Sequence, residues 1–225
     1  MKKIMLLFGL LWLPFLASAQ WSVLMTAAAG VAAETSITPA YGSSEPLHFG
    51  YSTLDYSFQG GVEVSYFYTP RFGLGSGLIY SHSRSLMDFR ANPDATEKKY
   101  WHSETIKIPL NLNWAFGKAR RSIILFGLVG NINLRRHEFD PPDYSSVTYR
   151  NNPFFLGIQL GYHYKLGNRF QIGILLYRDI NWFRKQIFQN SDGTIEPALT
   201  SERYFHTVQL TLSYRLFGNT VKGKN

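Results

Sequence analysis

The fold follows from one stretch of the sequence, Ile106–Phe116, which reads IKIPLNLNWAF. Large apolar residues occupy every second position, and the residues between them are polar or small. Successive side chains of a β-strand point to opposite faces, whereas this spacing would scatter the apolar residues around a helix. The stretch is therefore predicted to be a strand with one apolar face, and that face must meet either a protein core or lipid.

Residues 1–19 have the pattern of an export signal. Lys2 and Lys3 precede an apolar run, Ile4–Leu16, that is too short to span a bilayer as a helix. Ala17–Ala19 supplies the small residues of a cleavage site, so Gln20 is predicted to begin the mature chain. An uncleaved anchor helix is the alternative.

The composition excludes several classes of protein. The chain has 23 Lys and Arg against 15 Asp and Glu, and it has no Cys, which removes disulfide frameworks and thiolate chemistry. The basic residues are scattered, so no nucleic acid partner is expected. After the leader no window is comparably apolar, so a membrane protein with this sequence must be a barrel rather than a helical bundle.

Eight segments show the alternation of Ile106–Phe116. The connections after the second, fourth and sixth are short and the other connections are long, as in outer-membrane barrels. The predicted fold class is all-β, an eight-stranded antiparallel up-and-down transmembrane β-barrel. The predicted strands are Trp21–Ala33, Asp55–Tyr68, Phe72–Ser85, Tyr100–Phe116, Ser122–Arg135, Pro153–Leu166, Phe170–Phe183 and Arg203–Phe217.

Aromatic residues of the apolar face gather at the short-turn end of the strands, which predicts a girdle at the periplasmic membrane interface. Ile106–Phe116 covers about 33 Å, and a tilt of roughly 40° brings its rise to about 25 Å, the height of a lipid-facing band. The predicted girdle consists of Trp21, Tyr66, Tyr68, Phe72, Trp114, Phe116, Tyr162, Tyr164, Phe170 and Tyr214.

A secreted, soluble lipocalin-like binding barrel is the alternative fold. Its apolar face would point inward and its outer face would carry many charges. In this chain the polar face is rich in Gly, Ser, Thr, Asn and Gln, which fit a narrow, filled lumen. The predicted organisation is a signal peptide over residues 1–19, an outer-membrane β-barrel over 20–218 and a short basic periplasmic tail over 219–225.

Four motifs resemble the PorT-like family of eight-stranded outer-membrane β-barrels. The most specific is Ile106–Leu112, IKIPLNL, which is similar to the family's apolar-x-Ile-Pro-Leu strand. The others are Phe126-Gly127 with Gly130, the run from Leu156 to Gly161, and the closing run from Leu210 to Leu216. The resemblance implies a membrane barrel, and it brings no shared catalytic residues with it.

No residues are predicted to be catalytic, and none to bind a cofactor or a metal. The six His residues lack metal-ligand spacing with one another. His82-Ser83 and His102-Ser103 place His beside Ser, but neighbours on one strand face opposite sides and cannot form a proton relay.

The alternation points a set of charged and polar side chains into the lumen. Unpaired charges in a narrow lumen are costly, so Glu63 and Asp179 are predicted to be neutralised by basic neighbours. Pro109 cannot donate to the ladder, so one missing bond without a bulge is expected beside it, with the partner carbonyl satisfied from the lumen side. The predicted lumen network consists of Glu63, Lys107, Arg135, His163, Lys165, Asp179 and Arg215.

The leading prediction for function is a non-enzymatic integral outer-membrane barrel with a side-chain-filled lumen, long external loops and a structural or interaction role. The expected partners are outer-membrane lipid, the barrel-insertion machinery, and a protein or glycan at the external loops, where Phe139, Tyr144, Tyr149 and Phe188 lie. A small channel or a transport- or secretion-associated component is the first alternative. A lipid-modifying hydrolase, which would need a Ser–His pair from neighbouring strands, is another.

Overall fold

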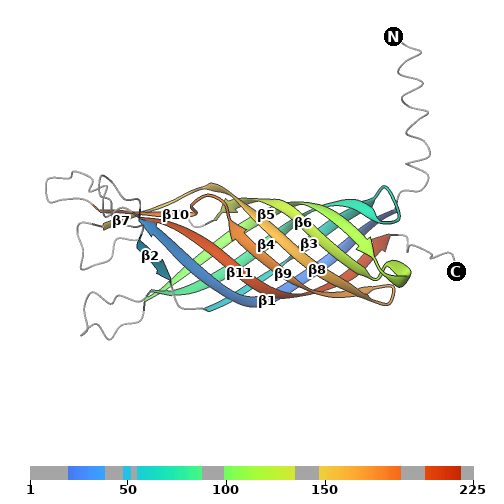
Figure 1. Ribbon diagram of the computed structural model, residues 1–225. Helices are drawn as coiled ribbons and strands as arrows, with labels where there is room; N and C mark the ends of the chain where they lie inside the picture. The colour runs from blue at the N-terminus through green and yellow to red at the C-terminus, as the bar shows by residue number, and fades with distance from the viewer. Residues whose placement is uncertain are drawn as a thin grey trace, which may run out of the picture.

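The computed structural model describes residues 20–38, 48–51, 55–87, 99–134, 147–188 and 201–218. The predictions for the leader, the tail, Arg135, Phe139 and Tyr144 lie outside these ranges. Eight long strands form a barrel with its short turns at one end (Figure 1). They are β1 (Gln20–Thr38), β3 (Asp55–Phe67), β4 (Phe72–Met87), β5 (Lys99–Phe116), β6 (Ser122–Asn133), β8 (Phe154–Leu166), β9 (Phe170–Asp179) and β11 (Ser201–Gly218).

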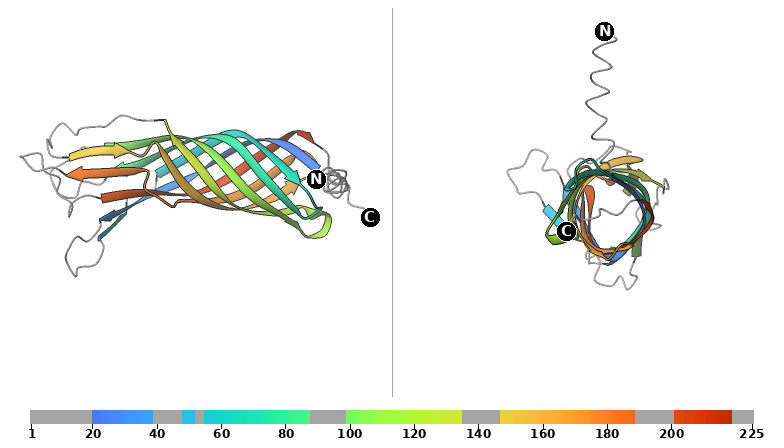
Figure 2. Two further views of the ribbon diagram at one scale, coloured as in Figure 1. Left: turned by 90° about the horizontal axis from the view of Figure 1, so that it is seen from above. Right: turned by 90° about the vertical axis from the view of Figure 1, so that its right-hand side faces the viewer.

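The barrel is closed by the first and last strands. Each barrel strand pairs with the next in an antiparallel ladder, and β1 also pairs with β11, from Ser22 opposite Gly218 to Ile37 opposite Glu202. The view down the axis shows the resulting ring (Figure 2). The predicted eight-stranded up-and-down barrel is confirmed.

Three short strands that the sequence did not predict extend the sheet at the other end, which we call the loop end. β2 (His48–Tyr51) pairs with β1, and β10 (Arg184–Phe188) joins β11 to β7 (Val147–Asn151). These segments were expected to be loops, so that prediction is wrong for them. Tyr149 and Phe188 lie in β7 and β10, and their side chains are outside the described ones.

The short connections are tight turns. Thr69 Oγ1 accepts hydrogen bonds from the backbone N–H groups of Arg71 (3.3 Å) and Phe72 (2.9 Å), which fixes the turn between β3 and β4. The turn between β5 and β6 contains a 3₁₀ segment, η1 (Lys118–Arg120), preceded by Gly117 at φ 79°. Among the described residues no helix is long and apolar enough to cross a membrane.

The distribution of side chains is the reverse of that in a soluble protein. Along each strand the buried positions are mostly polar and the exposed positions are mostly large and apolar. On β11, for example, Leu210 is 69% exposed while its neighbour Gln209 is 1% exposed. A wide apolar outer surface of this kind matches a lipid-facing band and excludes the soluble lipocalin-like alternative.

Pairing between β4 and β5 is interrupted opposite Pro109. Two residue pairs are missing, Gly77 with Pro109 and Leu78 with Ile108, and the register is the same on both sides of the gap. Both pairs need the N–H of position 109 as the donor to the carbonyl of Gly77, and proline has no N–H. The predicted missing bond without a bulge is confirmed, and a lumen-side partner for the carbonyl stays a prediction.

We expect Pro109→Ala to close this gap. The new N–H should donate to the carbonyl of Gly77, a gain of about 1 kcal/mol, while the loss of proline's rigidity in the unfolded chain offsets a similar amount. The free energy of unfolding should therefore change little. The measurement that decides is amide hydrogen exchange, in which a fast-exchanging amide at position 109 would contradict the expectation.

Candidate functional site

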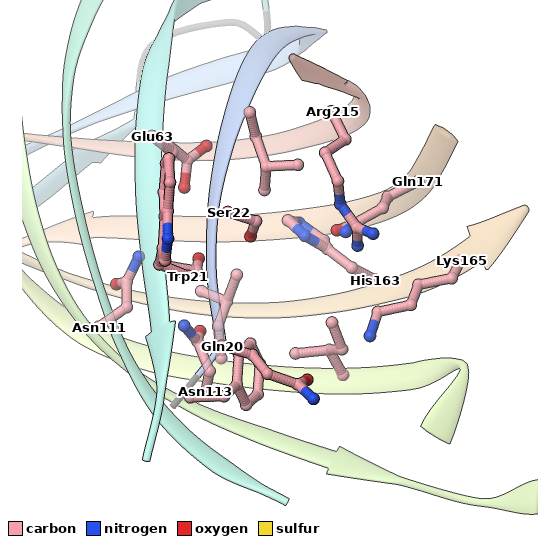
Figure 3. Close-up of a pocket in the computed structure, with 15 residues that line it drawn as sticks. Gln20, Trp21, Ser22, Glu63, Asn111, Asn113, His163, Lys165, Gln171 and Arg215 are labelled. Atoms are coloured by element: carbon pink, nitrogen blue, oxygen red, sulfur yellow. The ribbon is translucent and has the colours of Figure 1, made fainter. Parts of the chain in front are cut away.

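The lumen at the short-turn end holds a small polar vestibule (Figure 3). Glu63 comes from β3, His163 and Lys165 from β8, Gln171 from β9 and Arg215 from β11. The cavity between them has about 30 Å³ of free space, enough for about two water molecules. Four of the predicted lumen residues therefore line one space that is too small for an organic ligand.

Glu63 forms no ion pair with any residue that the structure describes. The side chain of Thr26 is the polar group that interacts with its carboxyl group. The basic side chains contact aromatic rings or stand alone instead: Lys165 Nζ lies 5.8 Å from the ring centroid of Phe67, and Arg215 Nε is buried without a hydrogen-bond partner. The predicted neutralisation of Glu63 by a basic neighbour is wrong for the described residues: Glu63 and Arg215 both stand opposite Leu24 of β1, yet no ion pair joins them.

We therefore expect Glu63→Gln to leave the free energy of unfolding unchanged or to raise it by about 1 kcal/mol. The amide keeps the shape and the hydrogen-bonding capacity toward Thr26 while removing a half-buried charge that lacks a counter-ion. Urea unfolding in detergent micelles measures the change. A loss of more than about 1 kcal/mol would restore the ion-pair hypothesis.

Amide and hydroxyl side chains fill the middle of the lumen. Gln159 Nε2 on β8 donates to Asn111 Oδ1 on β5 (2.7 Å), and Gln209 Nε2 on β11 donates to Ser57 Oγ on β3 (2.9 Å). The Ser57 hydroxyl also contacts Ser83 Oγ on β4 (2.8 Å). The Ser57–Ser83 contact joins neighbouring strands, whereas each amide hydrogen bond crosses one intervening strand, over Gly127 of β6 or Gly30 of β1. These side chains are buried and occupy the lumen side of the wall.

Asp179 is the centre of the lumen network near the loop end. It is 2% exposed, accepts a hydrogen bond from Tyr177 Oη (2.5 Å) and accepts another from the backbone N–H of Phe205 (2.8 Å). Lys107 is its basic neighbour but does not bond it directly, since Lys107 Nζ lies 3.9 Å from the ring centroid of Tyr177. The carboxylate is thus held by two hydrogen bonds, and the cation rests on the face of the tyrosine.

Gly157 makes room for this arrangement. A Cβ atom at position 157 would overlap the ring and hydroxyl group of Tyr177, which packs across the neighbouring strand. The glycine on the lumen face therefore permits the tyrosine to reach Asp179, as expected where large side chains crowd a narrow interior.

The strand β9 ends at Asp179, so the predicted end at Phe183 is wrong. Beyond this point the chain leaves β11, and pairing with β11 resumes only in β10 at Arg184. Side chains replace the lost ladder bonds: Asp179 accepts from Phe205 N–H, and Asn181 Oδ1 accepts from the N–H of Leu156 on β8 (2.5 Å). We call this interruption, residues 179–183, the wall bulge.

The wall bulge turns Phe183 into the lumen. Its ring packs on Phe205 (centroids 4.3 Å apart) and Phe155 (6.3 Å), and with Ala32 these form an apolar cluster that we call the aromatic plug. Phe183 is 1% exposed. The plug lies above Asp179 toward the loop end, so apolar packing closes the lumen there.

The predicted girdle residues lie at the short-turn end. Rings contact one another from strand to strand: Phe72 with Trp114 (6.4 Å between centroids), Trp114 with Phe116 (5.2 Å) and Phe116 with Tyr162 (6.4 Å). Opposite this arc, Phe170 contacts Tyr214 (5.1 Å). The remaining members, Trp21, Tyr66, Tyr68 and Tyr164, are exposed or half-buried at the same end.

We expect Trp114→Ala to lower the free energy of unfolding by about 2 kcal/mol. The substitution removes two ring contacts, each of which contributes about 1 kcal/mol, at the centre of the arc. Unfolding in lipid vesicles measures the loss. Trp114→Phe, which keeps a ring at the position, should recover at least half of it, and an equal loss in both variants would argue against ring packing.

A polar cluster lies on the outer face of β3, β4 and β5 at the loop end. His82 stacks on Phe58 (4.9 Å between ring centroids), and its Nε2 lies 3.4 Å from Nδ1 of His102. Arg84 Nε donates to Asp55 Oδ2 (2.7 Å), and the guanidinium holds the pKa of that carboxyl below its usual value. Sequence reasoning missed this cluster because only the registers of β4 with β3 and with β5 join its members.

None of these groups is arranged as a metal centre. Within the described ranges no set of three or more His, Asp and Glu side chains could hold a metal ion. A hydroxyl–imidazole pair does occur on the outer face, where Thr35 Oγ1 of β1 lies 2.7 Å from His206 Nε2 of β11. Arg178 is opposite His206 in the register, so a cation faces the imidazole where a relay would need a carboxylate.

A family model for the outer membrane protein beta-barrel domain matches residues 18–183. No curated protein sequence matches the chain. Similar solved structures include OprG of Pseudomonas aeruginosa, at 11% identity and a TM-score of 0.48 over 87% of this chain and 96% of that one. The outer membrane protein AlkL in lipid bilayers is 13% identical, with a TM-score of 0.49 over 92% of this chain and 93% of that one. Because the family model covers most of the closed barrel, the chain belongs to the outer membrane protein beta-barrel family, whose members lie in the outer membrane.

Proposed function

We propose that this protein is a non-enzymatic, non-conducting outer-membrane barrel with a structural or interaction role. The observation that carries the proposal is the filled lumen. The vestibule holds about 30 Å³ of free space, buried amide and hydroxyl side chains occupy the middle, and the aromatic plug packs inside the loop end. A pathway for solutes would need all three layers to move. The proposed role is therefore carried out by the outer surface of the protein.

Electrical recording tests this proposal. Purified protein inserted into planar bilayers should give no conductance steps, and liposomes containing it should not swell in solutions of small sugars. Reproducible steps whose size grows with salt concentration would favour the channel or transport alternative instead. Correct folding in the same samples is checked by the heat-dependent shift in gel mobility.

The loop end is the proposed interaction surface. β2, β7 and β10 carry the sheet beyond the barrel there, and residues 88–98 and 189–200 connect strands at that end. A protein or glycan partner is proposed to bind these connections. Cells displaying the protein should bind a component of a glycan or surface-protein array, and shortening residues 189–200 should abolish that binding without changing gel mobility. Unaltered binding after the deletion would contradict the assignment.

Two narrower proposals concern the export route and the family. The signal peptide is proposed to be cleaved after Ala19, where the small residues Ala17–Ala19 support the site, and insertion by the barrel-assembly machinery is proposed to follow. The intact mass of protein from the outer-membrane fraction should correspond to a chain beginning at Gln20. The IKIPLNL motif of β5 supports a PorT-like relationship within the larger family.

A further inference from the structure

The wall bulge leaves a pocket on the outer face of the barrel. Where β9 separates from β11, a cavity of about 350 Å³ opens, more than ten times the volume of the vestibule. Its lining residues are Thr35, Ile158, Arg178, Asp179, Ile180, Tyr204 and His206. Except for Asp179, these side chains belong to the outward-facing rows of their strands, so the pocket is open to the surroundings of the barrel rather than to the lumen.

Arg178 is the charged group of this pocket. Its side chain is exposed, and it forms no ion pair and no hydrogen bond with any residue of the described chain. The carboxylate of Asp179 is not its partner, because it is 2% exposed on the lumen face of β9, where it bonds Tyr177 and the N–H of Phe205, whereas Arg178 is on the outer face. A guanidinium without a counter-ion beside an apolar surface is costly unless an anion from outside the protein joins it.

The height of Arg178 places it at the outer edge of the lipid-facing band. It lies eight residues along β9 from the girdle residue Phe170, about 26 Å of strand, which a tilt of roughly 40° reduces to a rise of about 20 Å. Directly below it the outer face is apolar, with Leu176 and Val208 44% and 49% exposed. The guanidinium therefore lies where the headgroups of the outer leaflet begin, above a surface for acyl chains.

We propose that this pocket binds the phosphate of a lipid headgroup in the outer leaflet. Arg178 supplies the paired N–H donors that fit two phosphate oxygens. In the tautomer in which Thr35 donates to Nε2 of His206, the neutral imidazole carries its proton on Nδ1 and adds a further donor. The acyl chains lie against the apolar rows of β9 and β11. This lipid site goes beyond the interaction role proposed for the loop end.

Binding rather than hydrolysis follows from the charges. A His acting as a general base must become cationic, and a carboxylate normally stabilises it in that state. Here Arg178 stands opposite His206 in the register, and a second positive charge beside it opposes protonation. The same arrangement favours an anion placed between the two groups.

Native mass spectrometry of the full barrel in detergent tests the proposal. The probe is a bisphosphorylated glycolipid of the lipid A type, compared with its dephosphorylated form. Wild-type protein should retain the intact phosphorylated lipid, Arg178→Gln should retain at least tenfold less, and the dephosphorylated lipid should bind neither. Arg84→Gln is the matched control, since it removes an outward arginine whose charge is paired with Asp55, and its binding should stay within twofold of wild type.

Three results would overturn the site. Equal binding by Arg178→Gln and wild type would remove Arg178 from it, and equal binding of both lipids would remove the phosphate. Displacement by millimolar inorganic phosphate would show that a free anion, not a lipid headgroup, is bound. The heat-dependent shift in gel mobility shows whether each variant is folded. If Arg178→Gln is unfolded, the conservative Arg178→Lys variant replaces it. The same tenfold loss is expected for Arg178→Lys, because lysine cannot bind phosphate bidentately.

Discussion

Asp179→Ala should lower the free energy of unfolding by about 3 kcal/mol, as measured by urea unfolding in lipid vesicles. The substitution removes the acceptor of two buried hydrogen bonds, from Tyr177 Oη and from the N–H of Phe205. It also leaves the ammonium group of Lys107, which is 6% exposed, without its neighbouring carboxylate. Breaking such a buried network by deleting one member leaves the remaining donors without partners, and that accounts for most of the loss.

Two further variants separate this network from simple loss of volume. Asp179→Asn keeps one oxygen acceptor for the N–H of Phe205, so it should lose about half as much stability. Thr207→Val removes a buried hydroxyl that has no hydrogen-bond partner, and it should be neutral or stabilising by about 1 kcal/mol. If Asp179→Ala cost no more than Thr207→Val, the network would not be a determinant of stability.

Phe183→Ala should cost about 4 kcal/mol and open the loop end of the lumen. The ring of Phe183 is buried against Phe155 and Phe205 inside the barrel, and removing it leaves a cavity that the rigid wall cannot collapse to fill. The same urea titration measures the stability. Planar-bilayer recording measures the opening, and the double variant with Phe205→Ala should show it more strongly.

Phe154→Ala is the matched control for the plug. This residue is 66% exposed on the lipid-facing side of β8, one position before the buried Phe155. Its removal deletes the same atoms without creating an internal cavity, so we expect a loss of about 1 kcal/mol and no change in conductance. Equal losses in Phe154→Ala and Phe183→Ala would contradict the assignment of Phe183 to a closing plug.

The residue alternation was enough to predict which residues belong to which face. In β5, Lys107, Asn111 and Asn113 were assigned to the lumen, and each is buried there, whereas Leu110 and Leu112 are exposed on the outside. This worked because the side-chain period of a strand is two whatever the surroundings are. Even the gap beside Pro109 could be expected, since it follows from a missing N–H group.

The end of β9 could not be predicted in this way. The alternation continues past Asp179, so the sequence favoured a strand as far as Phe183. The wall bulge forms because Asp179 and Asn181 bind backbone groups of β11 and β8, and both partners are far away in the sequence. The ion-pair hypothesis for Glu63 failed for a related reason: alternation gives the face of a residue but not its side-chain contacts, and Glu63 forms no ion pair with Arg215 although both stand opposite Leu24.

By itself the sequence determined that eight alternating strands close into a barrel with an apolar outer face, because each strand carries its own period and each turn its own signal. Only the tertiary structure decided which side chains meet. Asn111 and Gln159 bond over Gly127 of the strand between them, and Arg178 reaches a pocket in the wall, because strand tilt and register bring together residues that no local pattern relates. The filled lumen and the outer pocket, on which the proposed functions rest, therefore depend on register rather than on local pattern.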